Sequence, residues 1–481
     1  MLSSSHYNLF ARAPQRRLLT TVSIILFLSV LLLRQQSPTR ITAQVPVNKA
    51  HHSKLPYHEE LGVSLGISEW GKRGQSTKKM IQWAEALIGH SDDVDETDKA
   101  LFQAALTHLF PFLAGTEKKL YTPWTSSTNE PPSNGVGIVI CAGSNNIHLA
   151  THLIRNLRRV HGSKLPIEIA YAGEKDLHSK HRNFLAREDV SFNNLLEFFP
   201  AARQDLKNSG WAMKPFALLA SSHTRAILID ADAIFLAAPD DIFESNAGLN
   251  RTGLLLFHDR ASEGRGGESL KFLKSQIEAA NRTVSSYLQN QSLFYRGVTS
   301  YEADSGAVAI DKSRPSLLLG LIFATWMNKK QVREEVTYKL YHGDKETYWI
   351  AMELANVEYF FQPWYAGSIG NIGQQSTDYD SATTDIIICG KHMLHLDSLG
   401  QKPFWFNGGI YDNKDSPEQG FGAMTHFWTG IKDAPPQWYW VPQGFACVKE
   451  KNINLLSEQD KKNLDLTRQQ VLEIDAEIKA L

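Results

Sequence analysis

Short apolar runs and helical stretches alternate through the middle of the chain. The runs Gly137–Ala142, Leu165–Tyr171 and Ala226–Asp230 have the length and apolar content of buried strands, and a glycine or an acid closes each one. Residues 146–160 and 214–222 lie between these runs and are predicted to be helices. Strands and helices that alternate at short intervals predict a mostly parallel α/β sheet.

Two outer segments also have a helical pattern. Apolar residues recur at helical spacing from Lys78 to Phe112, and charges separate the apolar positions from Ser457 to Leu481. We expect the second segment to pack on the domain or on a partner. Pro123–Gly135 is rich in Pro, Ser, Thr and Asn and is interpreted as a linker. The expected boundaries are 76–134 for a helical extension and linker, 135–450 for the main domain and 451–481 for the terminal helix.

The N-terminal pattern differs from the rest of the chain. An uncharged apolar run, Leu18–Leu33, lies between Arg17 and Arg34. It approaches the roughly 17–25 residues that a bilayer requires, and a short span suits the thinner membranes of the early secretory route. We expect a signal anchor with residues 1–17 in the cytoplasm, followed by a polar stem at 34–75. A cleavable signal peptide is the alternative.

Composition narrows the classes of protein that fit this pattern. With 481 residues, of which 42% are hydrophobic and 21% charged, the chain can form a sizeable core. A formal net charge of −1 argues against general nucleic-acid binding, which needs a basic surface. The three cysteines allow at most one intrachain bridge, and Cys389 and Cys447 are candidates for it in an oxidising lumen. Sequons at Asn250, Asn281 and Asn290 agree with a lumenal destination.

The candidate chemistry is concentrated after the third apolar run. Asp230 and Asp232 end that strand, and residues i and i+2 at the mouth of a strand point to the same side. Two carboxylates so close repel each other unless a cation or protons compensate. Mg²⁺ or Mn²⁺ would fit the pair and would neutralise a departing diphosphate. Ligands of parallel α/β sheets bind beyond the carboxyl ends of the strands, where Gly143 is also expected. A solvated Asp-x-Asp turn is the alternative.

Three later segments carry polar residues that fit the same site. Glu302–Asp311 is a turn of small residues that leads into a strand, with Asp304 at its mouth. Gly343–Trp349 opens a helix, with Asp344 in its first turn. Met393–Phe404 contains a histidine and, seven residues later, a lysine that precedes a proline.

Taken in order, these elements resemble a known family. From Gly137 to about Asn407 the chain looks like the fungal α-mannosyltransferases related to the α-1,3-mannosyltransferase of outer-chain glycan synthesis. This resemblance implies a hexosyltransferase with a GT-A fold, GDP-mannose as donor, Mn²⁺ as metal and retention of the α configuration. The matching elements are Gly137–Gly143, Leu165–Ile169, Met213–Pro215, Leu228–Asp232, Asp304–Gly306 with Asp311–Lys312, and Gly343–Glu346.

A more distant similarity, to glycogenin-like retaining transferases, implies roles for single residues. In those enzymes a histidine followed by Lys-Pro completes the metal site and grips the diphosphate. His395 and Lys402 match that pattern with a slightly longer spacing, and His392 is a competing choice for the histidine. The site residues implied are Asp230, Asp232 and His395 for the metal; Gly143, Lys214, Asp230, Asp232 and Lys402 for the donor; and Asp304 and Asp344 for catalysis.

The same interpretation gives expectations for partners and location. We expect a single-pass type II protein of the Golgi membrane, with a lumenal catalytic domain and a mannose-containing glycan as acceptor. A complex with other Golgi transferases stays open. A glycoside hydrolase, whose two acids usually lie about 5–10 Å apart, and a non-catalytic glycan-binding or scaffold protein are the alternative functions. Candidate aromatic residues for acceptor stacking are Trp211, Trp349, Trp364, Trp405 and Phe406.

Overall fold

The computed structural model describes residues 64–89, 96–117, 119–124, 135–261, 267–373, 387–428, 438–440, 446–449 and 453–481. These residues belong to a compact unit, Leu55–Leu481. The other unit, Met1–Lys54, contains the predicted membrane span and lies outside the described residues. In the part of the chain that is described, no helix has the length and apolar character needed to cross a membrane.

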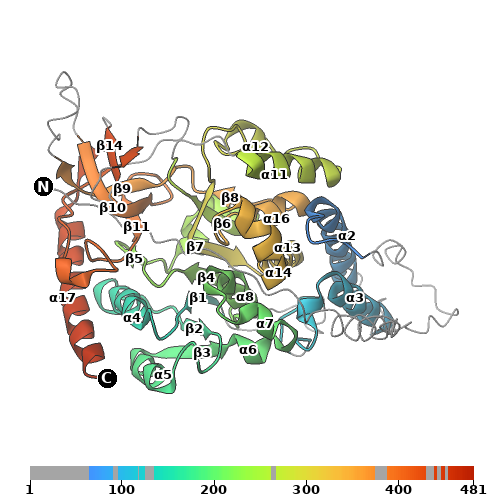
Figure 1. The fold of residues 1–481 in the computed structure, drawn as a ribbon, viewed down its shortest axis with the longest axis horizontal. Helices are drawn as coiled ribbons and strands as arrows, with labels where there is room; N and C mark the ends of the chain where they lie inside the picture. The colour runs from blue at the N-terminus through green and yellow to red at the C-terminus, as the bar shows by residue number, and fades with distance from the viewer. Residues whose placement is uncertain are drawn as a thin grey trace, which may run out of the picture. The chain divides into compact units, whose positions relative to one another are not determined.

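Within the described residues, a seven-stranded sheet forms the centre of this unit (Figure 1). The strands on one side of the sheet are mutually parallel, whereas β7 runs antiparallel to both of its neighbours, so four of the six pairings are parallel. The mostly parallel α/β sheet predicted from the sequence is confirmed. In sheet order the strands are β3 (Val190–Asn194), β2 (Ile167–Tyr171), β1 (Val136–Cys141), β4 (Arg225–Ile229), β7 (Ala303–Asp311), β6 (Leu254–His258) and β8 (Phe360–Phe361).

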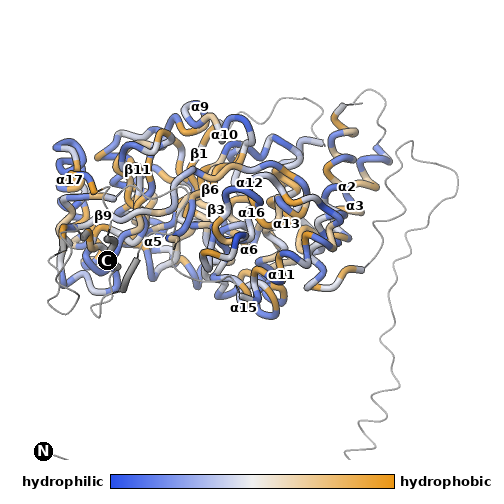
Figure 2. The backbone as a smooth tube through the Cα atoms, turned by 90° about the horizontal axis from the view of Figure 1, so that it is seen from above, coloured by the Kyte–Doolittle hydropathy of each residue, from blue (hydrophilic) through white to orange (hydrophobic). Residues whose placement is uncertain are grey.

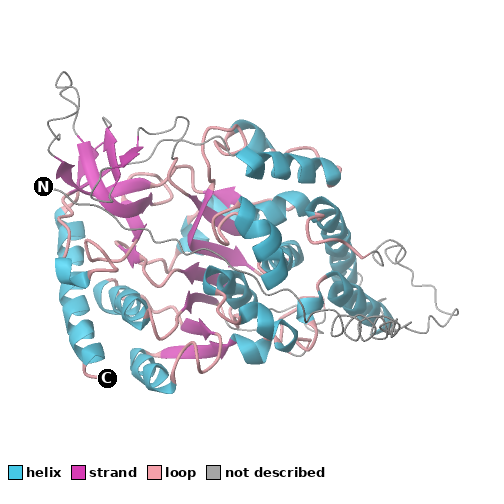
Figure 3. Cartoon of the chain, in the orientation of Figure 1, coloured by secondary structure: helices cyan, strands magenta, loops and turns pink. Residues whose placement is uncertain are grey.

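Helices cover both faces of this sheet (Figure 3). Successive side chains of a strand point to opposite faces, so β1 contributes to two cores. Ile138 and Ile140 pack beneath α4 (Ile147–Arg155) and α5 (Ser179–Leu185). Val139 packs in the second core with α8 (Met213–Ala220), α13 (Pro315–Met327) and α16 (Thr347–Ala355). A helix that is buried on all sides can be apolar all round, and α13 is apolar over most of its length (Figure 2).

The helical extension is part of this second core. It forms α2 (Trp70–Gly89) and α3 (Glu96–Leu109), so the first helix begins six residues before the expected boundary at 76. Trp70 is fully buried, and α2 packs against α13 and α16. A Cβ atom at Gly74 would come within 2.6 Å of the Leu354 carbonyl oxygen, so a glycine is needed for this close helix contact. α2 therefore stabilises α13 and α16, two of the helices in the core that contains Val139 of the sheet.

A second sheet, which the sequence pattern did not predict, follows the first in the chain. It contains β9 (Gly367–Gly373), β10 (Ile387–Leu396), β12 (His426–Trp428), β13 (Trp438–Trp440), β14 (Ala446–Lys449) and β15 (Ile453–Leu455), with β11 (Pro403–Asn407) paired to β10. β11 also pairs with β5 (Ile234–Phe235), where Trp405 lies opposite Phe235. Because β5 follows Asp232 by one residue, this pairing places the second sheet beside the paired aspartates.

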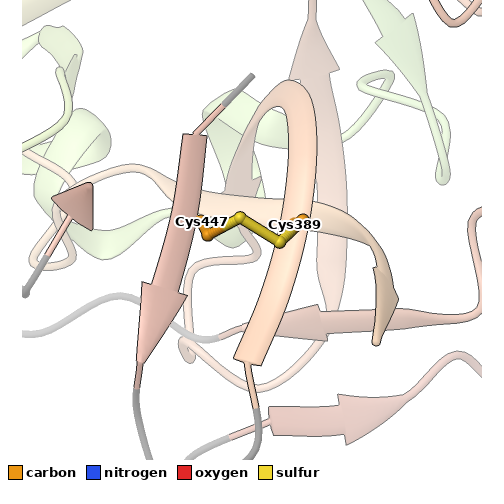
Figure 4. Close-up of a disulfide and its surroundings, with 2 residues drawn as sticks. All are labelled: Cys389 and Cys447. Carbon is orange, nitrogen blue, oxygen red and sulfur yellow. A yellow bond between two sulfur atoms is a disulfide. The ribbon is translucent and has the colours of Figure 1, made fainter. Parts of the chain in front are cut away.

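A disulfide joins two strands of the second sheet. Cys389 of β10 and Cys447 of β14 are directly paired in the antiparallel register, with their sulfur atoms 2.05 Å apart (Figure 4). The two cysteines that the sequence left as candidates are thus bridged. Cys141 has no disulfide partner.

The terminal segment packs on the domain. It forms α17 (Glu458–Lys479), and the side chain of Ser457 caps its first turn. Val471 and Ile474 are fully buried, and Nε2 of His152 on α4 lies 2.8 Å from Oδ1 of Asp475. The remaining helices described are α6 (Leu195–Phe198), α7 (Arg203–Leu206), α9 (Ile242–Ser245), α10 (Ala247–Thr252), α11 (Gly267–Ala279), α12 (Ser286–Asn290), α14 (Lys330–Val332) and α15 (Tyr338–Leu340).

Candidate active site

A buried lysine lies between two of the predicted carboxylates. Lys214, on the second residue of α8, is 4% exposed. Its Nζ lies 2.9 Å from Oδ1 of Asp230 and 3.5 Å from Oδ1 of Asp344. It also donates a hydrogen bond to Oγ of Ser305 at 2.8 Å. The structure therefore brings together three of the predicted residues: Lys214 on α8, Asp230 directly after β4, and Asp344. Asp344 lies in the turn before α16 and not in the first turn of that helix, where the sequence predicted it, because the helix begins only at Thr347.

The electrostatics of this cluster favour a cation. Burial raises the pKa of Asp230 to about 7, and the charges of Asp232 and Asp344 act in the same direction. Burial also raises the pKa of Asp344, although Lys214 opposes that shift. Burial acts to lower the pKa of Lys214, but Asp230 and Asp344 outweigh it and the pKa rises. One buried ammonium group is thus the shared partner of two carboxylates, Asp230 and Asp344, and added positive charge would stabilise their ionised forms further.

Asp232 has a different cationic partner. Its Oδ2 lies 2.5 Å from Nζ of Lys414, a residue in the segment that follows β11. Its backbone carbonyl accepts hydrogen bonds from the N–H groups of Gly408 at 3.2 Å and Gly409 at 2.6 Å. Both glycines have positive φ, +111° and +76°, so the tight turn that reaches Asp232 uses a conformation that glycine adopts readily.

Asp304 and His395 form a pair of their own. Nε2 of His395 lies 2.9 Å from Oδ2 of Asp304, and the imidazole stacks on Trp405 with ring centroids 4.1 Å apart. Burial acts to raise the pKa of Asp304, but the hydrogen bond and charge of His395 outweigh it and lower the pKa. The interaction with His395 therefore favours the ionised form of Asp304. His395 is the histidine to which the resemblance to glycogenin-like transferases gives a role in metal binding.

The predicted metal triad is not assembled in this structure. Among the residues described, no three His, Cys, Asp or Glu side chains are arranged to hold one metal ion. His395 is engaged by Asp304, whereas His392, the competing choice, is influenced by the charge of Asp232. Burial lowers the pKa of His392 to about 4, so its imidazole is neutral at pH 7 and chemically able to bind a metal. Asp230, Asp232 and His392 thus have side chains of the types that bind a metal. In this structure Asp232 is paired with Lys414 instead.

Lys402 does not lie near the paired aspartates. It is exposed in the turn between β10 and β11, where its backbone N–H and carbonyl bond to Asp397. Gly408, which contacts Asp232, is at the other end of β11, and a five-residue strand rises about 16 Å. The assignment of Lys402 to the donor phosphates stays a prediction, and the β10–β11 hairpin places this residue at the end of β11 opposite to Gly408.

Gly143 lies at the same edge of the sheet. β1 and β4 are parallel neighbours, so Gly143 and Asp230 follow adjacent strand ends. A Cβ atom at Gly143 would come within 2.7 Å of Oδ1 of Asp176, so the close approach of that side chain depends on the glycine. Cys141, two residues earlier, is partly buried, and desolvation raises the pKa of its thiol.

Sequence reasoning missed two residues of this cluster. Ser305 connects Lys214 with Asp344, to whose Oδ1 it donates a hydrogen bond at 3.3 Å, and only its position beside Asp304 could have indicated it. Lys414 pairs with Asp232, 182 residues earlier in the chain. The Gly408-Gly409 pair signals a turn before Lys414, but no local pattern shows which side chain that turn meets.

An α/β sheet with paired aspartates and a buried lysine at its carboxyl edge has the charged groups of a glycosyltransferase site, and comparison with known proteins shows this class. Residues 135–397 match the family described as "Mannosyltransferase putative". The chain belongs to this mannosyltransferase family, as the sequence elements had indicated.

Two curated relatives come from Saccharomyces cerevisiae. "Probable alpha-1,3-mannosyltransferase MNT4" is 27% identical over 311 residues, which cover 58% of this chain and 50% of that protein. "Alpha-1,3-mannosyltransferase MNN1" is 24% identical over 324 residues, which cover 57% of this chain and 41% of that protein. The chain thus spans about half or less of the length of these relatives.

A solved structure matches at a low score. Core-mannan synthase A (CmsA/Ktr4) from Aspergillus fumigatus, in its Mn/GDP-form, is 11% identical, with 51% of this chain and 77% of that chain covered and a TM-score of 0.32.

Proposed function

We propose that the protein transfers mannose from GDP-mannose to a mannose-containing glycan in an α-1,3 linkage, retains the α configuration, and depends on Mn²⁺ or Mg²⁺. The observation that carries the proposal is the cluster of Lys214, Asp230 and Asp344 at the carboxyl edge of β4 in a chain of the mannosyltransferase family. The names of the yeast relatives support the linkage. The donor follows from the family resemblance of the sequence motifs.

The side chains at the paired aspartates have the donor chemistry that a divalent metal requires. Two carboxylates, one with a pKa raised to about 7, and a neutral imidazole are suitable ligands for Mn²⁺ or Mg²⁺ with donor phosphates. Asp230 and Asp232 would hold the ion, and His392 is favoured over His395 as the nitrogen ligand because Asp304 engages His395. When bound, the ion supplies positive charge to the diphosphate as it leaves. Lys414, released from Asp232, would add a second positive charge there.

The buried side chains determine where charge is stabilised during transfer. Transfer breaks the bond between C1 of mannose and the phosphate oxygen and forms a bond from C1 to the acceptor oxygen. The acceptor proton goes to the departing phosphate, and GDP leaves. Asp344 stabilises the positive charge that develops at C1, while Lys214 opposes the rise in pKa that burial causes in Asp344 and Asp230. Asp304, fixed by His395, is a positioning residue that adds to the field around Lys214.

We also propose a lumenal location, with the protein anchored in the Golgi membrane as a single-pass type II protein. The Cys389–Cys447 bridge supports an oxidising compartment. Asn281 and Asn290 are exposed and are available to carry N-linked glycans there.

A transfer assay tests the reaction and its site together. The purified full chain is incubated with GDP-mannose and an α-mannoside acceptor, with Mn²⁺ or with chelator, and compared with Asp232→Ala and with Asp465→Ala, an exposed aspartate on α17. We expect transfer with Mn²⁺ in wild type and Asp465→Ala, and at least a 100-fold loss with chelator or Asp232→Ala. Transfer that is indifferent to chelator would contradict the metal proposal. Release of mannose from a glycoside without metal would favour a hydrolase.

A further inference from the structure

One aromatic side chain is exposed beside the cluster. Trp211 is 54% exposed, whereas Trp349, Trp405 and Phe406, which the sequence also nominated for sugar stacking, are fully buried. Trp364 is partly buried and donates a hydrogen bond from its indole to the Gly400 carbonyl. An exposed tryptophan leaves a large apolar surface in water, which burial against a ligand would relieve.

Trp211 continues into a row of rings. It lies in the short turn η5 (Gly210–Ala212), and its ring centroid is 5.1 Å from that of His342. The ring also lies against Gly343, where a Cβ atom would come within 3.0 Å of Cε3. The ring of Tyr301 is 6.1 Å from His342. His342 is exposed and Tyr301 partly exposed, so the aromatic strip formed by Trp211, His342 and Tyr301 is open to a ligand.

Each ring of the aromatic strip is tied to the charged cluster. Trp211 precedes Lys214 by three residues, His342 precedes Asp344 by two, and Tyr301 precedes Asp304 by three. Because three residues span at most about 11 Å, each ring lies within about that distance, along the backbone, of Lys214, Asp344 or Asp304. A ligand on the strip would thus place its nearest hydroxyl groups beside Asp344.

The polar surroundings suit an uncharged ligand. Nζ of Lys345 lies 3.5 Å from the centre of the Tyr301 ring and 2.6 Å from Oδ2 of Asp259. The positive charge next to the strip is therefore already compensated by a carboxylate. A pyranose has one apolar C–H face, which can pack on the aromatic rings. The hydroxyl groups around its edge can form hydrogen bonds with the Lys345–Asp259 ion pair.

We propose that the aromatic strip is the acceptor subsite and that it holds the terminal mannose of the glycan, with the C–H face of the sugar on Trp211. This assignment rests on the proposed function, since it assumes that mannose is the group transferred. It leaves the donor with the aspartates and gives the acceptor a separate surface, formed by the three rings of the strip.

Kinetics and ligand-observed NMR test the strip separately. The full chain is compared with Trp211→Ala, Trp211→Phe and Leu472→Ala; Leu472 is an exposed leucine, 58% accessible, on α17. We expect the acceptor KM to rise at least about tenfold in Trp211→Ala, with partial recovery in Trp211→Phe and no change in Leu472→Ala. We expect the donor KM to change less than twofold. An unchanged acceptor KM, or an equal rise in donor KM, would overturn the assignment.

Saturation-transfer NMR with methyl α-mannopyranoside distinguishes this failure from failure of the proposed function. If wild type transfers no mannose but saturates the mannoside signals and Trp211→Ala does not, the strip stands and the proposed reaction fails. If both proteins saturate the mannoside equally, the strip is overturned. Thermal melts of each variant show whether the exposed substitution alters folding.

Discussion

Nζ of Lys414 lies 2.5 Å from Oδ2 of Asp232, so the second aspartate of the paired motif is held by a lysine that is 182 residues away in sequence. Burial acts to lower the pKa of Lys414, but the charge of Asp232 outweighs it and raises the pKa, so the lysine is cationic. The lysine therefore competes with any metal for Asp232.

Removing this competitor should strengthen metal binding. Lys414 is 39% exposed, and an ion pair of this kind is worth about 0–1 kcal/mol. In the absence of nucleotide we expect Lys414→Ala to bind Mn²⁺ up to about fivefold more tightly than wild type, as measured by electron paramagnetic resonance titration. Lys402→Ala, at the far end of β11, is the matched control and should bind Mn²⁺ like wild type. Weaker binding by Lys414→Ala would contradict the competition.

Stability should depend on pH through Asp230. Its pKa is raised from 3.8 to about 7 in the folded state, so the folded protein binds this proton more tightly than the unfolded chain. The resulting stability is present below pH 4 and is lost as the pH rises through 7. Asn at position 230 does not titrate, so Asp230→Asn lacks this pH dependence. The free energy of unfolding of the variant minus that of wild type should therefore rise by about 2–3 kcal/mol from pH 5 to pH 8. Urea unfolding at both pH values measures this difference. A constant difference would show that Asp230 has an ordinary pKa.

Lys214 should be essential for stability at neutral pH. It is buried with Asp230 and Asp344, and removal of one partner from a buried ion pair leaves an uncompensated charge. We expect Lys214→Met to lose about 3–5 kcal/mol in urea unfolding at pH 8 and less at pH 5, where Asp230 can be protonated. The double variant Lys214→Met/Asp230→Asn should recover part of the loss, and strictly additive effects would contradict the pairing.

The disulfide should stabilise the second sheet. Cys389 and Cys447 are 58 residues apart, and closure of a loop of this length stabilises a fold by about 4 kcal/mol in the chain-entropy model. We expect the Cys389→Ser/Cys447→Ser variant to lose about 2–4 kcal/mol, measured by urea unfolding, and its stability to be insensitive to dithiothreitol. Cys141→Ala should keep the sensitivity of wild type to the reductant. Equal stability of the double variant and wild type would contradict a structural bridge.

The N-terminal boundary of the folded unit should lie before Trp70. A fragment of residues 64–481 keeps all of α2, whereas 76–481 lacks Trp70 and Arg73, both buried. Loss of a buried tryptophan alone costs about 3–5 kcal/mol. We expect the shorter fragment to be less stable by at least this amount in thermal and urea unfolding. Similar melting temperatures for the two fragments would show that the first turns of α2 are dispensable.

The sequence determined the elements whose character is local. The apolar runs of β1, β2 and β4 and the helices α4, α8 and α17 were all visible, because burial imposes a period on neighbouring residues. The position of Asp230 at the end of β4 followed from the same rule. The strands of the second sheet were missed because, as in Gly367–Gly373, glycine and polar residues interrupt their apolar pattern.

The tertiary structure alone decided which side chains meet. The pairing of His395 with Asp304 rather than with the paired aspartates depends on the β10–β11 register and on the stacking of His395 on Trp405. Lys414, and not Lys402, contacts Asp232 because the C-terminal end of β11 is the end that reaches this aspartate. Local sequence fixes the period and the ends of an element, but contacts across 91 or 182 residues arise only when sheets pair and loops close.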